Sequence, residues 1–166
     1  MGSMGSMRSI RSTPTRSAAL PGAALVFSEV AGVDGRGVLR ALADELAAAG
    51  AVPDGEDLFQ RLWEREQLGS TGVGAGVAIP HCKLAGLERA ILAVGLARQA
   101  VAFGAPDGQP VKAFFVVVSP SESPAEHLRS LALVSRWLKS DGHAEQVVRN
   151  GDREAIHGLL QLVARS

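Results

Sequence analysis

Residues 65–83 read REQLGSTGVGAGVAIPHCK, the least ordinary stretch of the chain. Three alternating glycines occupy its middle: Gly72, Gly74 and Gly76. An apolar run follows at 77–79 and ends at Pro80-His81, which predicts a short buried strand after a glycine-rich turn. Glycine at this density permits unusual backbone angles and lets another group approach the main chain closely, as phosphate-binding loops require.

Two common nucleotide-binding motifs do not fit these glycines. A dinucleotide fingerprint needs Gly-x-Gly-x-x-Gly after a strand and before a helix, whereas here Gly-x-Gly-x-Gly follows a predicted helix and leads into a strand. A Walker loop ends in Gly-Lys followed by Ser or Thr, which this stretch lacks. Both motifs are therefore excluded here.

His81 is a candidate nucleophile because it directly follows Pro80 at the end of the apolar strand. The fixed φ of proline lets the imidazole be aimed outward over the edge of the sheet. If one ring nitrogen donates its N–H to a backbone carbonyl, the other keeps a lone pair, which a pKa of about 6.5 leaves available at neutral pH. Position alone also fits a structural or merely exposed histidine.

Helical periodicity brackets this stretch on both sides. The predicted helices cover residues 35–49, 54–67, 124–139, 143–149 and 152–164. Asp34, Ser123 and Asp152 are predicted N-caps, and Pro124 takes a first helical position. Gly50 stands where a left-handed terminator would end the first helix.

Two short apolar runs predict buried strands, AILAVGLA at 90–97 and VKAFFVVVS at 111–119. The connecting FGAPDGQP is dense in turn residues, so we expect the two strands to pair as neighbours, in a direction that the sequence leaves open. Strands embedded among helices predict an α/β domain of three layers, with a small mixed β-sheet of about five strands flanked by helices.

The composition is that of one folded domain. Of 166 residues 46% are hydrophobic and 20% charged, and no apolar run approaches the ~20 residues of a membrane-spanning helix. Seventeen Lys and Arg balance seventeen Asp and Glu, so neither nucleic acid nor insertion into a membrane is expected. The single cysteine, Cys82, excludes an intrachain disulfide and favours a reducing, cytoplasmic setting.

The first 19 residues are expected to lie outside the fold. Residues 1–6 read MGSMGS, a duplicated segment typical of a cloning remnant, and 8–19 hold three arginines but almost no large apolar residue. We interpret 1–19 as this remnant with a disordered basic tail, and 20–166 as the domain. Pro21 and Gly22 interrupt the apolar segment after the arginines, so no signal peptide is expected.

The central stretch resembles the active-site motif of the type-2 enzyme IIA domains of the bacterial phosphoenolpyruvate-dependent phosphotransferase system, the mannitol/fructose class. The matching positions are Glu66, Val73, Gly74, Val77, Ala78, Ile79, Pro80, His81 and Cys82. The likeness runs from about residue 20 to the C-terminus. LGSTGVGAG at 68–76, FGAPDGQP at 103–110 and HLRSLALVSRWL at 127–138 resemble the nitrogen-regulatory branch in particular, which occurs as a free single domain.

This resemblance implies a set of site residues. His81 would accept a phosphoryl group on Nε2 from the phosphohistidine of a carrier protein of the HPr type. The turn at 72–76 would offer backbone N–H groups to the phosphate. Arg65 corresponds to an arginine near the phosphoryl site, and His127 to a second active-site histidine in the first turn of a helix. The alternatives are a solvated cation for Arg65 and an exposed polar residue for His127.

No cofactor and no metal are expected. Cys82 stands where relatives commonly have glycine, and its place next to His81 does not make a recognised zinc spacing. His143 and His157 lie on predicted surface helices and are expected to be solvated.

Two functions fit the resemblance. One is a regulatory protein whose phosphorylation state changes which target it binds, with family links to nitrogen metabolism and potassium homeostasis. The other is a fructose- or mannitol-type sugar component that passes its phosphoryl group to a IIB domain. The chain carries neither a IIB nor a membrane IIC domain and its loops resemble the nitrogen branch, so the sequence favours the regulator.

Overall fold

The computed structural model describes residues 25–165, so the predicted tail at 1–19 and the predicted domain start at 20 lie outside the described residues. The elements along the chain are β2 (Val26–Val30), α1 (Gly35–Ala48), α2 (Gly55–Gln67), β3 (Gly72–Gly74), β4 (Val77–Ala78), β5 (His81–Leu84), β6 (Ile91–Val101), β7 (Val111–Pro120), α3 (Pro124–Lys139), α4 (His143–Asn150) and α5 (Arg153–Arg165).

The predicted helices are confirmed, and each boundary lies within one residue of its expected position. The Asp34 carboxylate accepts the Gly37 N–H at 2.8 Å, and the Asp152 carboxylate accepts the Ala155 N–H at 3.1 Å, so both act as N-caps. Ser123 occupies the N-cap position of α3, but its side chain makes no capping hydrogen bond, and that prediction is wrong. Pro124 follows in the first turn. Its fixed φ suits a helix, and because it has no N–H, the start of α3 has one backbone donor fewer to cap.

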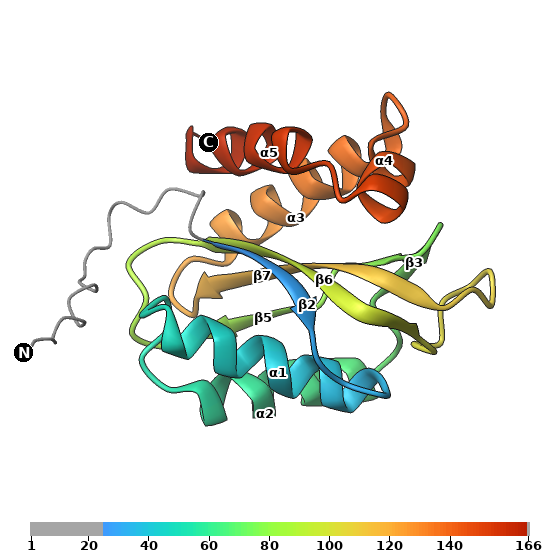
Figure 1. Ribbon diagram of the computed structural model, residues 1–166. Helices are drawn as coiled ribbons and strands as arrows, with labels where there is room; N and C mark the ends of the chain where they lie inside the picture. Colours follow the sequence, from blue (N-terminus) through green and yellow to red (C-terminus); the bar gives the residue numbers. More distant parts are fainter. Residues whose placement is uncertain (1–24, 166) are drawn as a thin grey trace, which may run out of the picture.

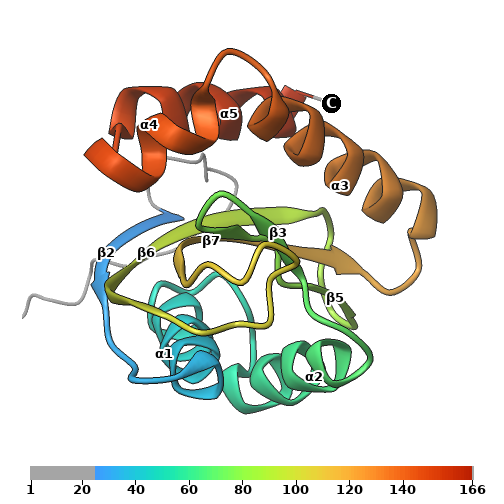
Figure 2. The same ribbon diagram turned by 90° about the vertical axis from the view of Figure 1, so that its right-hand side faces the viewer.

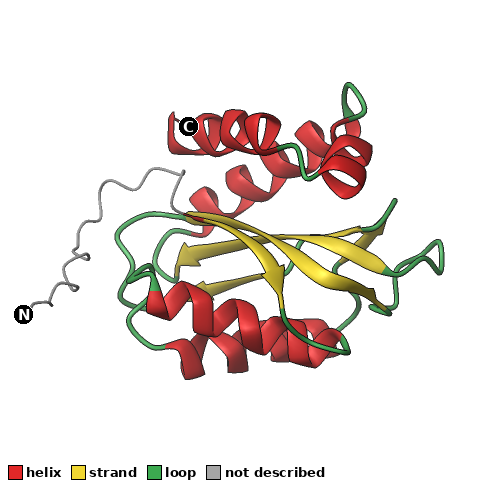
Figure 3. Cartoon of the chain, viewed as in Figure 1, coloured by secondary structure: helices red, strands yellow, loops and turns green. Residues whose placement is uncertain are grey.

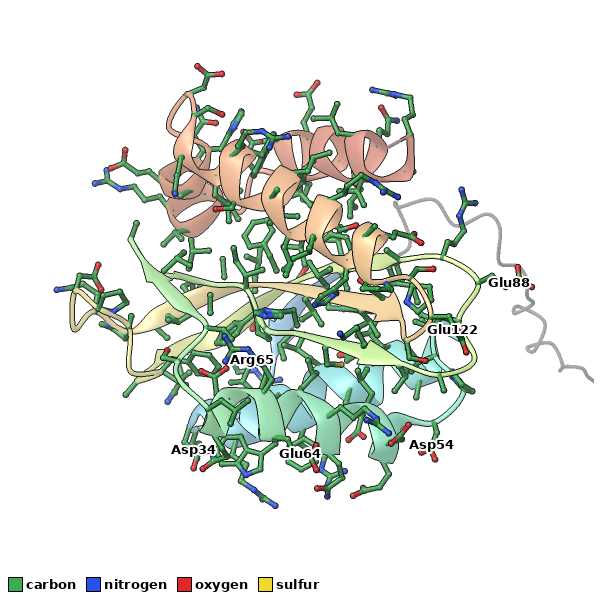
Figure 4. The ribbon with its side chains drawn as sticks, turned by 180° about the vertical axis from the view of Figure 1, so that it is seen from behind. Asp34, Asp54, Glu64, Arg65, Glu88 and Glu122 are labelled. Atoms are coloured by element: carbon green, nitrogen blue, oxygen red, sulfur yellow. The ribbon has the colours of Figure 1, made fainter. Side chains whose placement is uncertain are left out.

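Helices α1 and α2 lie antiparallel. Figure 4 places their N-cap residues, Asp34 and Asp54, at opposite ends of this layer. Gly50 follows α1 with a φ of +77°, the left-handed conformation that glycine tolerates, and lets the chain reverse direction.

One mixed sheet of six strands runs in the order β2-β6-β7-β4-β3, with β5 also paired to β7. β6 and β7 are antiparallel neighbours, which settles the direction that the sequence left open. β2 is parallel to β6, β4 and β5 are parallel to β7, and β3 is antiparallel to β4. The sequence predicted neither β2 nor β5, and it expected a glycine-rich turn where β3 forms. β6 continues to Val101, beyond the expected end at 97.

β4 and β5 follow one another along the same edge of β7. Val77 pairs with Ala113, and His81 pairs with Val117. Pro80 has no N–H to donate, so the ladder breaks there, although its carbonyl still accepts the Val117 N–H at 2.9 Å. His81 therefore begins a strand, whereas the sequence placed it at the end of one.

Helices cover both faces of the sheet. α1 and α2 pack on one face and α3, α4 and α5 on the other (Figures 1 and 2), so the sheet, yellow in Figure 3, forms the middle of three layers. Phe114 and Val116 of β7 join the core under α1 and α2, and Phe115 and Val117 join the core under α3, α4 and α5. Burial on both faces explains the unbroken apolar run of β7. The three-layer α/β prediction is confirmed.

Within residues 25–165, none of the helices combines the length and the apolar character needed to span a bilayer.

Candidate functional site

The imidazole of His81 lies on the face of the sheet that α3 covers. Side chains alternate along a strand, and the neighbouring Cys82 and Leu84 pack in the core under α1 and α2, on the opposite face. His81 Nδ1 lies 2.8 Å from the Ile79 carbonyl oxygen. Because a carbonyl only accepts hydrogen bonds, Nδ1 carries the ring proton and, in the neutral ring, Nε2 carries the lone pair. His81 is thus held in the tautomer that a nucleophilic Nε2 requires.

Arg65, in the last turn of α2, reaches the free nitrogen of His81. Its Nε–H donates to His81 Nε2 over 3.3 Å, and its Nη1 donates to the Gly69 carbonyl oxygen over 2.8 Å. Figure 4 shows the side chain between α2 and the sheet. The guanidinium is therefore fixed beside His81, and the alternative of a merely solvated cation is wrong.

His127 brings a second imidazole to the same place from the first turn of α3. Its ring centroid lies 5.6 Å from that of His81, and the ring planes are tilted by 48°. The residue is 9% exposed, and its Nδ1 lies 2.7 Å from Ser119 Oγ. The alternative of an exposed polar residue is therefore wrong for His127. The structure brings Arg65, His81 and His127 together.

The three glycines of the turn are not equivalent. Arg65, His81 and Gly72 line a hollow of about 250 Å³ between the β3–β4 hairpin and α3, whereas Gly74 and Gly76 do not line it. The Gly72 N–H already donates to Ser70 Oγ at 2.9 Å. Gly74 and Gly76 have φ values of +97° and +80°, which the hairpin turn requires. Only one of the three glycines thus lies beside His81.

Two polar contacts close to the site were not predicted. The Glu66 carboxylate binds Thr71, and the Ser119 hydroxyl binds His127. Glu66 belongs to the motif, so the sequence marked its position. Nothing in the sequence marked Thr71 as its partner. The only sequence signal for Ser119 is a lone hydroxyl at the end of an apolar strand, just before Pro120.

A family model described as "Phosphoenolpyruvate-dependent sugar phosphotransferase system, EIIA 2" matches residues 23–162. The chain belongs to this family. It is therefore a phosphotransferase-system IIA component, as the resemblance implied.

Three relatives show which branch this IIA domain is most like. The nitrogen regulatory protein of Pseudomonas aeruginosa is 40% identical over 140 residues, which cover 84% of this chain and 90% of that protein. The crystal structure of nitrogen regulatory protein IIA-Ntr from Neisseria meningitidis is 30% identical, with a TM-score of 0.71 over 82% of this chain and 92% of that one. A fructose-specific EIIA component of Haloferax volcanii is 29% identical over 124 residues, covering 75% and 80%. The IIA domain is thus more similar to the Pseudomonas regulator than to this sugar component.

Both imidazoles of the IIA domain are kept neutral at neutral pH. Burial lowers the pKa of His81 below its ordinary value of 6.5, and the Arg65 charge lowers it further. The hydrogen bond to the Ile79 carbonyl and the Glu66 charge raise this pKa, but they do not outweigh burial. Burial, followed by the charges of His81 and Lys83, also lowers the pKa of His127. His81 Nε2 therefore keeps its lone pair at pH 7.

Cys82 does not share the hollow with His81. Its side chain packs against the core under α1 and α2, and burial raises the pKa of the thiol to about 12. The thiolate that redox chemistry and metal binding need is therefore not formed at neutral pH. Among residues 25–165, no group of three or more His, Cys, Asp and Glu side chains is arranged to hold a metal ion.

The remaining histidines are not simply solvated, and the prediction for them is wrong. His143 stacks on Trp137 with ring centroids 4.0 Å apart, and its Nδ1 lies 2.9 Å from the Trp137 carbonyl oxygen. His157 buries its Nε2 without a hydrogen-bond partner among the described residues. Both sit where α4 and α5 pack onto their neighbours, so their rings contribute to packing.

Proposed function

We propose that this IIA domain is a regulatory phosphocarrier. His81 Nε2 accepts a phosphoryl group from the phosphohistidine of an HPr-type carrier, and the phosphorylation state is signalled to regulatory target proteins. The observation that carries the proposal is the hydrogen bond from His81 Nδ1–H to the Ile79 carbonyl, which leaves Nε2 as the unprotonated nitrogen in the hollow.

The transfer exchanges one nitrogen–phosphorus bond for another. The lone pair of His81 Nε2 forms the new N–P bond while the N–P bond of the carrier breaks, and the released electron pair returns to the carrier's imidazole. His81 does not have to lose a proton from Nε2, because its ring proton stays on Nδ1 with the Ile79 carbonyl. Such a transfer depends on in-line positioning and on donors to the equatorial oxygens.

Arg65 and His127 supply these donors better than the glycine-rich turn does. The Arg65 Nε–H is bound to Nε2 in the free protein, so it exchanges this nitrogen for a phosphoryl oxygen when the group arrives. The N–H of Gly72 is occupied by Ser70 Oγ, and Gly74 and Gly76 do not line the hollow. The His127 ring, by contrast, packs directly beside that of His81, with centroids 5.6 Å apart. We therefore assign the phosphoryl oxygens to the two side chains.

The regulatory assignment rests on the relatives. The nitrogen regulatory protein of Pseudomonas aeruginosa covers most of both chains at 40% identity. The second candidate is a sugar-specific component that passes its phosphoryl group to a IIB domain, which the family description and the fructose-specific relative support. Both functions place the protein in the reducing cytoplasm, which suits a single free cysteine.

Labelling tests the acceptor. The protein is incubated with radiolabelled phosphoenolpyruvate, enzyme I and an HPr-type carrier. We expect one label that is lost in acid and stable in base, as nitrogen-linked phosphate is, and that is absent from His81→Ala. His143→Ala, whose histidine lies on α4, is the control and keeps the label. Undiminished labelling of His81→Ala would overturn the assignment.

A second reaction separates the two functions. The phosphorylated protein is mixed with a purified fructose-type IIB domain. A regulator keeps its label on the time scale on which a fructose-specific IIA protein, run in parallel, loses its own. Rapid transfer to the IIB domain would establish the sugar component instead.

A further inference from the structure

We propose that Ser119 is a positioning residue for His127. Its hydroxyl donates to His127 Nδ1, fixes the ring proton on Nε2 and thereby presents an N–H donor to a phosphoryl group on His81. The part that concerns the phosphoryl group rests on the proposed function. The tautomer of His127 is a property of the free protein and is tested without it.

Ser119 is the one polar side chain at the end of an otherwise apolar strand face. Three residues precede it on this face of β7: Ala113, Phe115 and Val117. Ser119 is fully buried, and its backbone pairs with Lys83, one step along the face from the pairing of Val117 with His81. This register places the hydroxyl beside the His81 strand and under the first turn of α3, where His127 lies.

The direction of the hydrogen bond follows from what each group can do. Among residues 25–165, the Ser119 hydroxyl has one hydrogen-bond partner, His127 Nδ1 at 2.7 Å. A buried hydroxyl needs an acceptor for its proton, and Nδ1 is the acceptor within reach. In a neutral imidazole the accepting nitrogen is unprotonated, so the proton of His127 is on Nε2.

The two rings are consequently held in opposite tautomers. His81 has its proton on Nδ1, because it faces a carbonyl, whereas His127 has its proton on Nε2, because it faces a hydroxyl. With ring centroids 5.6 Å apart, the two imidazoles are direct neighbours. A phosphoryl oxygen on His81 gains a hydrogen bond from this donor, whereas the other tautomer of His127 would offer it a repelling lone pair.

The charge state of His127 makes its tautomer matter. An imidazolium would carry protons on both nitrogens, so its Nε2 would donate with or without the Ser119 hydroxyl. In the free protein that meets the carrier, burial, with the charges of His81 and Lys83, lowers the pKa of His127, so the neutral ring with a single N–H donor dominates at pH 7.

Nuclear magnetic resonance of protein labelled with ¹⁵N in histidine tests the tautomer. Two variants of matched shape differ only in the hydroxyl: Ser119→Thr keeps it and Ser119→Val removes it. Long-range ¹H–¹⁵N spectra at about pH 8, above the ordinary histidine pKa, read the tautomer of each ring. Wild type and Ser119→Thr are expected to show His127 with its proton on Nε2, whereas Ser119→Val raises the Nδ1–H fraction several-fold. A wild-type proton on Nδ1, or a Ser119→Val spectrum like the wild type, overturns the proposal.

Single-turnover phosphoryl transfer tests the consequence. With saturating phosphorylated carrier, Ser119→Val is expected to react about tenfold more slowly than Ser119→Thr, the size of one hydrogen bond to the transferred group. In a His127→Ala background the same substitution has no further effect, because Ser119 acts through that ring. Equal rates for the Thr and Val variants contradict the proposal. Thermal unfolding of every variant shows whether it folds. If Ser119→Val does not fold, Ser119→Ala replaces it.

The two tests separate the inference from the proposed function. If His81 is never labelled, the proposed function fails while the tautomer result still decides the role of Ser119. If labelling is normal but the hydroxyl changes neither spectrum nor rate, only the inference fails.

Discussion

Glu66 binds Thr71 with both oxygens of its carboxylate: Oε2 accepts the backbone N–H at 2.9 Å, and Oε1 accepts the hydroxyl at 2.7 Å. Thr71 is 5% exposed, so this contact provides the acceptors that its polar groups need. It also closes the segment between α2 and β3. Arg65 stands just before this segment and Gly72 just after it, and both line the His81 hollow.

Removing the Glu66 carboxylate is expected to destabilise the fold and to change the titration of His81. Glu66→Ala leaves the Thr71 N–H and hydroxyl without their acceptor, which costs about 2 kcal/mol in the free energy of unfolding. Because the Glu66 charge raises the pKa of His81, its loss is expected to lower that pKa. Urea unfolding and a histidine titration by nuclear magnetic resonance measure the two effects. Glu66→Gln, which keeps one oxygen but not the charge, is the control: it costs less stability than Glu66→Ala but lowers the pKa of His81 alike.

The neutral imidazoles make stability depend on pH with a definite sign. The pKa values of His81 and His127 are lowered from 6.5 by burial, so the unfolded chain binds protons there more readily than the folded protein. Their contribution to stability is fully present above 6.5 and is lost as the pH falls from 6.5 through the folded pKa values. Urea unfolding at pH values between about 8 and 5 is expected to show this loss, and His81→Asn is expected to reduce it. Stability that rises as the pH falls below 6.5 would contradict the burial of the two rings.

The helices were predictable because each carries its own apolar periodicity, and some also carry a residue that marks an end, such as Asp34 and Gly50. Among the strands that were missed, β2 and β5 show the physical reasons. β2 exposes Ser28 and Glu29 in succession, and Glu29 has a φ of +57°, so no alternation of apolar residues marks the strand. β5 consists of HCKL, and it is a strand only because β7, far along the chain, pairs with its backbone. Edge and irregular strands of this kind depend on tertiary contacts that a local pattern does not contain.

The residues of the site also divide into those that the sequence indicated and those that it did not. Arg65, His81 and His127 could be named in advance because the resemblance carried them. Ser119 could not, because its contact depends on the register of β7 against β5 and on where α3 begins. The phosphate-binding role of Gly74 and Gly76 stays a prediction. Glycine fits both a phosphate loop and a tight hairpin, and the structure shows both residues with positive φ in a hairpin turn, outside the lining of the hollow.

Cys82 is expected to be unreactive in the folded protein. Burial raises the pKa of its thiol to about 12, so the thiolate, which is the nucleophile, is scarce at pH 8. Modification by a disulfide reagent such as dithiobisnitrobenzoate is therefore expected to be at least about tenfold slower in native protein than in protein unfolded by urea. A native rate close to the unfolded rate would show that the thiol is exposed and would reopen a redox role.

The close packing of α1 against β6 depends on one glycine. A Cβ added at Gly95 would clash with Leu42 Cδ2 and lie 3.3 Å from Val30 Cγ2, and both of those side chains are buried in the core under α1 and α2. Gly95→Ala is therefore expected to destabilise the protein by about 1–3 kcal/mol, the usual cost of overpacking a core. Gly158 on α5 is the control, since a Cβ there meets nothing within 4 Å. Gly158→Ala is expected to stabilise the helix by about 0.5–1 kcal/mol.

A double-mutant cycle ties the loss at Gly95 to its neighbour. Leu42→Ala alone leaves a cavity, but combined with Gly95→Ala it removes the atom that the new methyl group meets. The free energies of unfolding from urea titration are expected to be non-additive, with the double variant at least about 1 kcal/mol more stable than the sum of the single changes predicts. Additive losses would show that the cost at Gly95 does not come from its contact with Leu42. A Gly95→Ala protein as stable as the wild type would show that α1 can move away from β6 at little cost.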